Sequence, residues 1–145
     1  MNQTVLVVAA SLLLAAVTDV PVAVVEAPES PVHLDRVRML TADEAPPVLL
    51  YAATNRTKDE LDQFTVMVFV FDQEGRLKAR QVAPGRRTLM AGETKFSAMV
   101  LDVGAIAPTD TLMAGVDQAQ RVGSDAWWRA DLRTLAEETV ANRKR

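Results

Sequence analysis

The stretch that most constrains the fold is Phe64–Phe71, a run dominated by β-branched and aromatic side chains. Such side chains favour extended strands over helices because they pack well on a pleated surface. The segment Asp72–Gly75 that follows, Asp-Gln-Glu-Gly, is typical of a tight turn between two strands. The stretch therefore predicts the central strand of a β-sandwich, followed by a hairpin.

Turn residues divide the rest of the chain into short segments that also favour strands. The expected strands are Val32–Leu40, Val48–Thr54, Phe64–Phe71, Arg76–Val82, Thr94–Leu101 and Thr111–Val122. About six or seven short strands at this spacing are typical of an all-β sandwich rather than of alternating strands and helices. We therefore expect an immunoglobulin-like sandwich of two antiparallel sheets.

The C-terminal segment has a different pattern. Leu132, Leu135 and Val140 recur at helical spacing, and Asp131 precedes them at a position suited to a helix N-cap. The pattern predicts a short amphipathic helix over Leu132–Asn142.

The N-terminus carries an unbroken run of apolar or small residues, Val5–Val17. Its length suits the core of a secretory signal, whereas a bilayer-spanning helix needs about 20 residues. No Lys or Arg precedes the run, which leaves two alternatives. One is a short membrane anchor that extends through Val22–Val25, and the other is a buried strand pair in a protein that is never exported.

These features predict three regions. Residues 1–20 are expected to be a signal peptide or short membrane leader, with cleavage between Ala15 and Ala27. Residues 21–31 contain three prolines and predict an extended linker. Residues 32–145 are expected to form the sandwich with its C-terminal helix. The expected location is periplasmic or extracellular, with a membrane tether if the leader is uncleaved.

Composition excludes several kinds of chemistry. The 145-residue chain has no cysteine, so disulfides, thiolate nucleophiles and Cys-ligated metals are excluded. Its net charge of −3 argues against nucleic acid, whose phosphates select basic surfaces. The basic cluster Arg143–Arg145 is best explained as a solvated tail.

His33 is the only histidine, so a Ser-His-Asp triad would need it together with Ser97 or Ser124. Neither serine lies in a Gly-x-Ser-x-Gly elbow, which favours a solvated or capping histidine.

Asn55-Arg56-Thr57 matches a glycosylation sequon, but an Asn that ends a strand explains it more simply.

Carboxylates gather in two loops, without the alternating spacing that a calcium loop requires. They are Asp59, Glu60, Asp62, Asp72 and Glu74. We therefore expect solvated acidic loops, no catalytic residues, no metal and no cofactor.

The central strand is apolar on both faces, although a sandwich strand normally has one polar face. If the β-branched side chains face the core, then Met67, Phe69 and Phe71 lie on the outer face of the sheet. Exposure of such an area is disfavoured, so either the C-terminal helix or another protein should cover it. Of the neighbouring Trp127 and Trp128, only one can face the core, and the other is an exposed aromatic anchor.

The middle third of the chain resembles the FxLYD-type immunoglobulin-like domains of bacterial envelope proteins. The matching residues are Asn55, Phe69, Phe71, Asp72, Gly75, Gly92, Glu93 and Phe96. The resemblance implies a sandwich fold and an envelope location, and it carries no active site. The segment Trp127–Arg145 and the absence of a lipoprotein cysteine depart from the family pattern, which leaves the mode of attachment open.

The function expected from these features is a non-enzymatic binding or structural module of the bacterial cell envelope. It would contact another envelope protein or a second copy of itself, with no role in nucleic-acid binding. The candidate interaction surface is Met67, Phe69, Phe71, Trp127 and Trp128. The alternative is an exported module that binds a polysaccharide or small ligand through Trp127, Trp128 and Tyr51.

Overall fold

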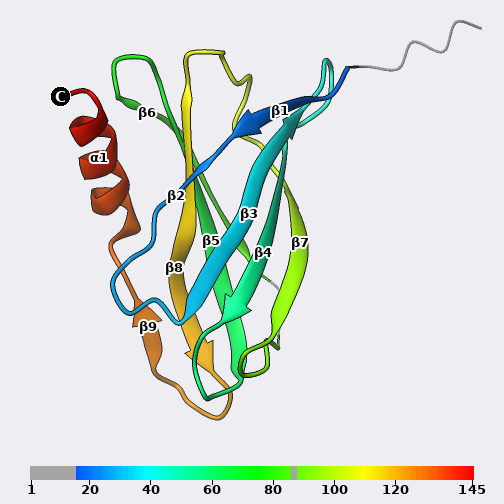
Figure 1. Cartoon of the computed structure of the whole chain (residues 1–145), viewed down its shortest axis with the longest axis vertical. Helices are drawn as coiled ribbons and strands as arrows, with labels where there is room; N and C mark the ends of the chain where they lie inside the picture. Colours follow the sequence, from blue (N-terminus) through cyan, green and yellow to red (C-terminus); the bar gives the residue numbers. More distant parts are fainter. Residues whose placement is uncertain (1–15, 86–87) are drawn as a thin grey trace, which may run out of the picture.

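The computed structural model describes residues 16–85 and 88–145, which form a sandwich of two β-sheets with one helix beside it (Figure 1). The β4 sheet has the strand order β1-β3-β4-β7, and the β5 sheet has the order β2-β8-β5-β6, with β9 paired to β8. The elements are β1 (Thr18–Pro21), β2 (Ala23–Val24), β3 (Val32–Thr41), β4 (Val48–Asn55), β5 (Leu61–Phe71), β6 (Leu77–Pro84), β7 (Thr94–Val100), β8 (Thr111–Arg121), β9 (Trp127–Arg129) and α1 (Leu132–Arg143).

The strand order confirms the predicted immunoglobulin-like sandwich with a short C-terminal helix. In immunoglobulin lettering, β3, β4 and β7 are strands A, B and E, while β6, β5, β8 and β9 are C′, C, F and G. The structure has more strands than expected. Thr18–Pro21, mostly at the end of the segment expected to be a leader, form β1, the Pro-rich segment supplies β2, and the two tryptophans begin β9.

The main core fills the space between the two sheets. From β5, Phe64, Val66, Val68 and Val70 all face this core and are fully buried. Because alternate residues of a strand point to opposite faces, Met67, Phe69 and Phe71 face outward from the β5 sheet. The predicted orientation of the central strand is therefore confirmed.

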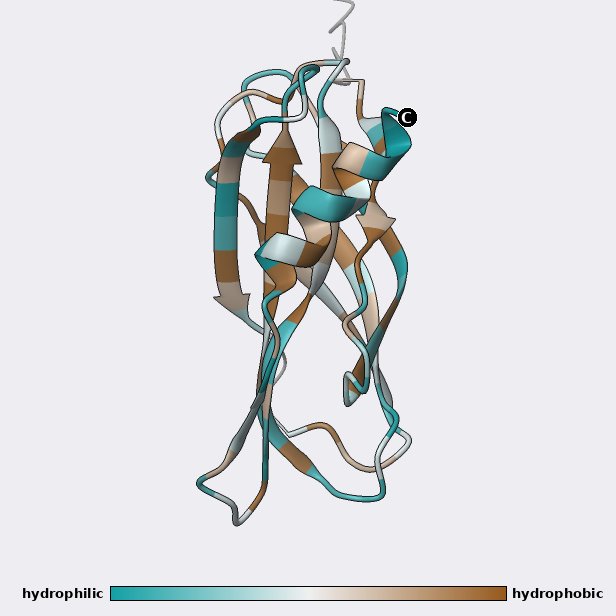
Figure 2. Ribbon diagram, turned by 90° about the vertical axis from the view of Figure 1, so that its left-hand side faces the viewer, coloured by the Kyte–Doolittle hydropathy of each residue, from teal (hydrophilic) through white to brown (hydrophobic). Residues whose placement is uncertain are grey.

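A second apolar cluster lies between the outer face of the β5 sheet and α1. This helix cluster consists of Val25, Phe69, Phe71, Met113, Leu132, Ala136 and Val140. Figure 2 shows α1 lying across hydrophobic strands of this sheet. The helix begins after Asp131, whose carboxylate accepts a hydrogen bond from the Thr134 N–H at 3.1 Å, as expected for an N-cap.

The segment 21–31, expected to be a linker, is instead part of the sandwich. Its residues 23–24 form β2, which pairs in parallel with β8, and Val25 and Ala27 are buried. The prediction that the folded domain begins near Val32 is therefore wrong. The prolines do not prevent pairing, because Pro21 ends the edge strand β1, a position where no ladder donor is needed.

Gly115 of β8 allows two other segments to pack closely on its strand. A Cβ atom there would lie 2.3 Å from the carbonyl oxygen of Val25 and 2.8 Å from a methyl group of Leu132. The missing side chain lets the chain after β2 and the start of α1 both approach β8. The irregularity in β8 lies further along, where the register with β5 shifts beside Val116.

The apolar run Val5–Val17 lies outside the described residues except for Ala16 and Val17. In the part of the chain that the structure describes, α1 is the one helix, and it is not long and apolar enough to cross a membrane.

Candidate functional site

The expected interaction surface on β5 is largely buried by the protein itself. Phe69 and Phe71 are fully buried under α1, with their ring centroids 6.2 Å apart, and Met67 packs at the margin of the helix cluster. The sequence predicts that either the C-terminal helix or another protein covers this surface, and in the structure the helix covers it. These three side chains therefore stabilise the packing of α1 and present no open face to a partner.

Trp127 and Trp128 lie on β9 and are both half-buried. Trp128 packs against the main core, whereas Trp127 belongs to neither apolar cluster. Both line a hollow of about 360 Å³ at the end of the sandwich where β9 lies. Tyr51, grouped with them on sequence grounds, is 4% exposed and faces the main core, so it is not part of that hollow.

The outer face of the β4 sheet carries an apolar row along β4 and β7, and it lies on the opposite side of the sandwich from α1 (Figure 1). Cross-strand pairing aligns the outward residues of β4 and β7: Val48 with Val100, Leu50 with Ala98, and Ala52 with Phe96. We call this row the open face. Phe96 and Val100 are 60% and 61% exposed, respectively. A contiguous apolar surface of this kind marks an interaction site more often than isolated exposed side chains do.

A β-bulge in β3 places a cation at the open face. The register between β3 and β4 shifts between Asp35 and Arg38, and Arg36 within this bulge has a φ of +51°. The Asp35 carboxylate accepts a hydrogen bond from the Arg36 N–H at 2.8 Å. The Arg36 guanidinium lies 5.6 Å from the centroid of the Phe96 ring, within cation–π range. A left-handed conformation is costly for arginine, and here it directs the guanidinium over an aromatic ring.

A groove of about 490 Å³ runs beside this pair, lined by Arg36, Arg38, Leu50, Phe96 and Ala98 with Tyr51 and Ser97 beneath. Arg38 forms an ion pair with Asp19 at 3.5 Å. Arg36 forms no ion pair with any described residue, and no carboxylate is among the groove residues that the structure describes. The groove therefore combines an apolar floor with a guanidinium that has no counter-ion among the described residues.

A signal for the open face is present in the sequence. In β7, Phe96, Ala98 and Val100 share one parity, while Met99 faces the core. The outward parity of β7 is thus apolar after Thr94, whereas its inward parity combines Lys95 and Ser97 with Met99. The interaction surface predicted from the sequence includes none of these β7 residues. In the structure, β5 has a helix over its outer face, and β7 has none within the described part of the chain.

The residues considered for a hydrolytic triad do not come together. His33 on β3 binds the Glu26 carboxylate at 2.9 Å, and Arg56 binds the same carboxylate at 3.2 Å. The Ser97 hydroxyl is buried without a hydrogen-bond partner in the described chain, and Ser124 lies in the turn before β9.

The two acidic loops lie at opposite ends of β5, so their carboxylates cannot share a ligand. Asp59 forms an ion pair with Arg121 at 3.1 Å. Asp72 accepts hydrogen bonds from the N–H groups of Arg76 and Glu74, which hold the pKa of its carboxyl below the usual value. Within residues 16–85 and 88–145, no group of His, Asp or Glu is arranged to hold a metal ion.

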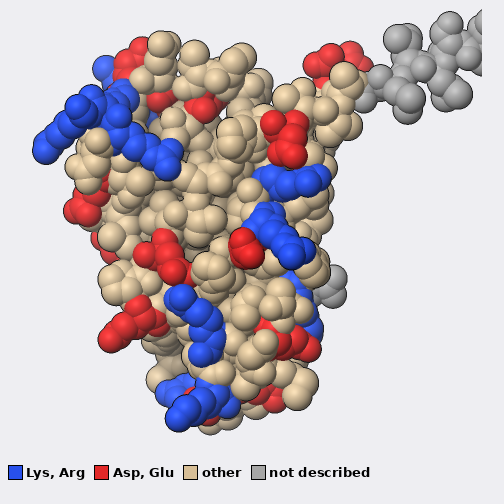
Figure 3. Space-filling view, viewed as in Figure 1, with Lys and Arg blue, Asp and Glu red and all other residues tan. Residues whose placement is uncertain are grey.

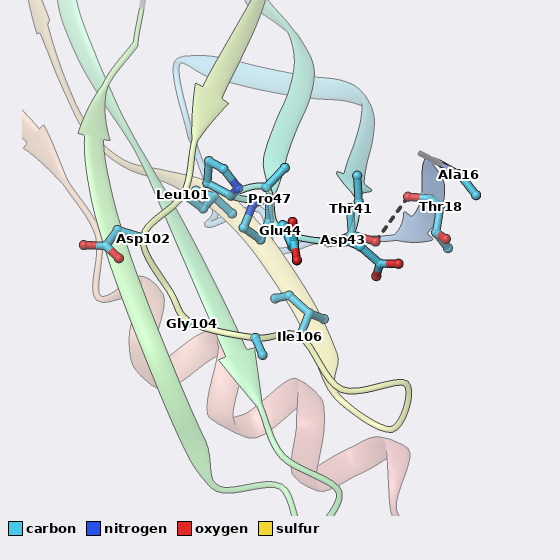
Figure 4. A pocket seen from close by; sticks show the side chains of 14 residues that line it. Ala16, Thr18, Thr41, Asp43, Glu44, Pro47, Leu101, Asp102, Gly104 and Ile106 are labelled. Atoms are coloured by element: carbon cyan, nitrogen blue, oxygen red, sulfur yellow. Dashed lines mark hydrogen bonds between the residues drawn. The ribbon is translucent and has the colours of Figure 1, made fainter. Parts of the chain in front are cut away.

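A further hollow of about 480 Å³ lies at the end of the sandwich opposite β9, between residues 41–47 and 101–106. Figure 4 shows Asp102 pointing away from Asp43 and Glu44, while a hydrogen bond joins Thr41 to the Thr18 carbonyl. Its acidic side chains therefore do not converge on one point.

Figure 3 shows basic and acidic residues interspersed on the face in view, without a large patch of either sign.

No family model, no curated protein and no solved structure matches this chain. The resemblance to FxLYD-type domains stays a prediction. The candidate sites are therefore defined by their geometry alone: the open face with its Arg36–Phe96 pair, and the hollow beside β9.

Proposed function

We propose that the protein is a non-enzymatic binding module of the bacterial cell envelope that contacts another protein through the open face. The observation that carries the proposal is the difference between the two sheets. The outer apolar face of the β5 sheet is covered by α1, whereas the β4 sheet leaves Phe96 and Val100 more than half exposed. Burial of apolar area contributes about 25 cal/mol per Å², which favours a partner over solvent.

The groove also indicates the chemistry of the partner. A protein that inserts an apolar side chain between Leu50 and Phe96 would remove both from water. A carboxylate beside that side chain would pair with Arg36, whose guanidinium has no ionic partner among the described residues. We therefore expect the partner to present an apolar residue next to an Asp or Glu.

The envelope location is supported by two features of the sequence. One is the apolar run Val5–Val17, and the other is the resemblance to envelope domains over the middle third of the chain. A binding role fits a domain whose polar side chains are engaged in structural contacts, as His33 is with Glu26 and Asp72 is with its own turn.

Site-specific photo-cross-linking in the producing cells tests this proposal. A photoreactive residue replaces Ala98, which lies exposed in the middle of the open face. The matched control carries it at Val82, an exposed residue of β6 on the other sheet. We expect a discrete protein adduct from position 98 and none from position 82.

Two further variants define the contacts. Phe96→Ser should abolish the adduct without lowering the melting temperature, because Phe96 is largely exposed. Arg36→Glu should lower the yield of the adduct more than Arg36→Lys does if the partner binds Arg36 through a carboxylate. Identical adducts from positions 98 and 82, or an adduct unaffected by Phe96→Ser, would contradict the proposal. An adduct of twice the protein's own mass would identify the partner as a second copy.

A further inference from the structure

The hollow beside β9 has the size and lining of a small-ligand site. Its volume of about 360 Å³ lies within the range of about 300–1,000 Å³ that is typical of ligand pockets. Two indole rings, from Trp127 and Trp128, line it together with the apolar side chain of Pro31. The charged groups in its lining are the Asp59–Arg121 ion pair and the Glu29 carboxylate.

The loops that form its walls are held by buried or bridging hydrogen bonds. On the β2–β3 side, the Arg56 guanidinium binds the Ser30 carbonyl at 3.0 Å, and the Arg56 N–H binds the Pro31 carbonyl at 2.9 Å. On the β4–β5 side, the fully buried Asn55 side chain binds the Asp59 carbonyl at 2.7 Å. A site whose walls are already ordered loses little conformational entropy when a ligand binds.

The charges at the hollow narrow the class of ligand. Glu29, Asp59 and Arg121 together carry one net negative charge, which disfavours an anionic ligand. The Asp59 carboxylate is already neutralised by Arg121 at 3.1 Å, so a cation would find only Glu29 without an ionic partner in the described chain. A neutral ligand fits best, because it can accept a hydrogen bond from the guanidinium and donate one to the carboxylate of the same pair.

We propose that this hollow binds a neutral carbohydrate. A sugar ring has an apolar C–H face that packs on an indole ring by dispersion and burial of apolar area, and hydroxyls at its rim that suit the Asp59–Arg121 pair. The site is separate from the open face and does not depend on the proposed protein partner.

Intrinsic tryptophan fluorescence tests the proposal, because Trp127 and Trp128 are the only two tryptophans in the chain. The full-length protein is titrated with cellotriose, chitotriose and maltotriose, and separately with tetramethylammonium as a cationic probe. We expect a saturable change in emission with at least one trisaccharide and none with tetramethylammonium. No response to any of the three sugars, or a stronger response to the cation, would overturn the proposal.

Matched variants show whether the response comes from this hollow. Trp127→Ala should weaken binding by about tenfold or more, which corresponds to about 1.4 kcal/mol, while Trp128 remains as the reporter. Trp127→Phe should recover part of the affinity because it keeps an aromatic ring. Asp59→Asn should also weaken binding, and Phe96→Ser, on the open face, should leave it unchanged. Equal affinity in Trp127→Ala and the unmodified protein would contradict the assignment.

Discussion

Asn55 shows how a single buried polar residue can organise two loops. Its side chain is fully buried, yet both of its polar atoms have partners. The amide nitrogen donates to the carbonyls of Asp59 and Leu89 at 2.7 and 3.0 Å, and the amide oxygen accepts from the Thr57 N–H and hydroxyl at 2.9 and 2.8 Å. The interpretation of Asn55 as a strand-ending residue holds, since β4 ends there. A sugar could not be attached to this buried amide in the folded protein.

Replacement of Asn55 should be strongly destabilising. Asn55→Ala removes the hydrogen bonds to the Leu89 and Asp59 carbonyls and the acceptor of the Thr57 N–H, at an expected cost of about 3 kcal/mol in the free energy of unfolding. Asn55→Asp should cost at least as much, because a carboxylate cannot donate to the two carbonyls. Urea denaturation measures both, with the exposed Lys58→Ala in the same loop as control. A loss below about 1 kcal/mol for Asn55→Ala would contradict this account.

At the scale of elements, three segments far apart in sequence meet over Gly115. The Val25 N–H donates to the Ala114 carbonyl at 2.9 Å, and the Leu132 side chain lies directly above the glycine. This contact explains how β2 can pair with β8 while the start of α1 packs on the same strand. The helix cluster depends on it, since Val25 and Leu132 both belong to that cluster.

Gly115→Ala should therefore disturb β2 and α1 together. The added methyl would lie 2.3 Å from a backbone oxygen, so the chain after β2 must shift, and we expect a loss of about 2 kcal/mol. Hydrogen exchange should show faster exchange at the Val25 amide and in the first turn of α1. Gln118→Ala on the same strand is the control and should change little. Unchanged exchange at Val25 in Gly115→Ala would refute the packing argument.

At the scale of the whole molecule, the two sheets share one core but differ in what lies outside them. The β5 sheet has a second apolar layer, in which Phe69 and Phe71 are sealed by Leu132, Ala136 and Val140. The β4 sheet has no such layer in the described structure, and its open face meets solvent. The molecule thus has three layers in the order β4 sheet, β5 sheet and α1, and the outer surface of the β4 sheet is left without a cover in the described structure.

Removal of α1 should convert the covered sheet into a second exposed apolar face. A chain that ends at Ala130 leaves Phe69, Phe71 and Met113 uncovered. We expect a melting temperature lower by several degrees, stronger binding of the dye ANS, and concentration-dependent association in sedimentation experiments. A chain that ends at Asn142 keeps the helix cluster and should behave like the full-length protein. Equal ANS binding by the two truncated chains would show that α1 is not a structural cover.

Much of the architecture follows from local pattern. The strand predicted over Phe64–Phe71 is present, although β5 begins earlier, at Leu61. The orientation of Val66 and Phe69 to opposite faces and the helix after Asp131 also agree with the structure. These features depend on side-chain periodicity and capping, which act over a few residues. The segment 21–31 was mistaken for a linker because prolines mark breaks in a strand, and its pairing with β3 and β8 depends on residues far away in the chain.

The candidate sites could be predicted from the sequence only in part. Trp127 and Trp128 were identified as notable, but the hollow also needs Asp59 and Arg121, which lie more than sixty residues apart in sequence. The left-handed conformation of Arg36 follows from a bulge in the pairing of β3 with β4, which no local signal indicates. The exposure of Phe96 depends on where α1 packs.

A sandwich with a terminal helix can be predicted from local pattern, because alternation and helical spacing are properties of neighbouring residues. Which sheet the helix covers, and therefore which apolar face stays open, depends on the folded chain. The outward faces of β5 and β7 both carry apolar side chains, and one short helix can cover only one of them. That choice is made by long-range contacts such as Leu132 over Gly115, which exist only once the chain has folded.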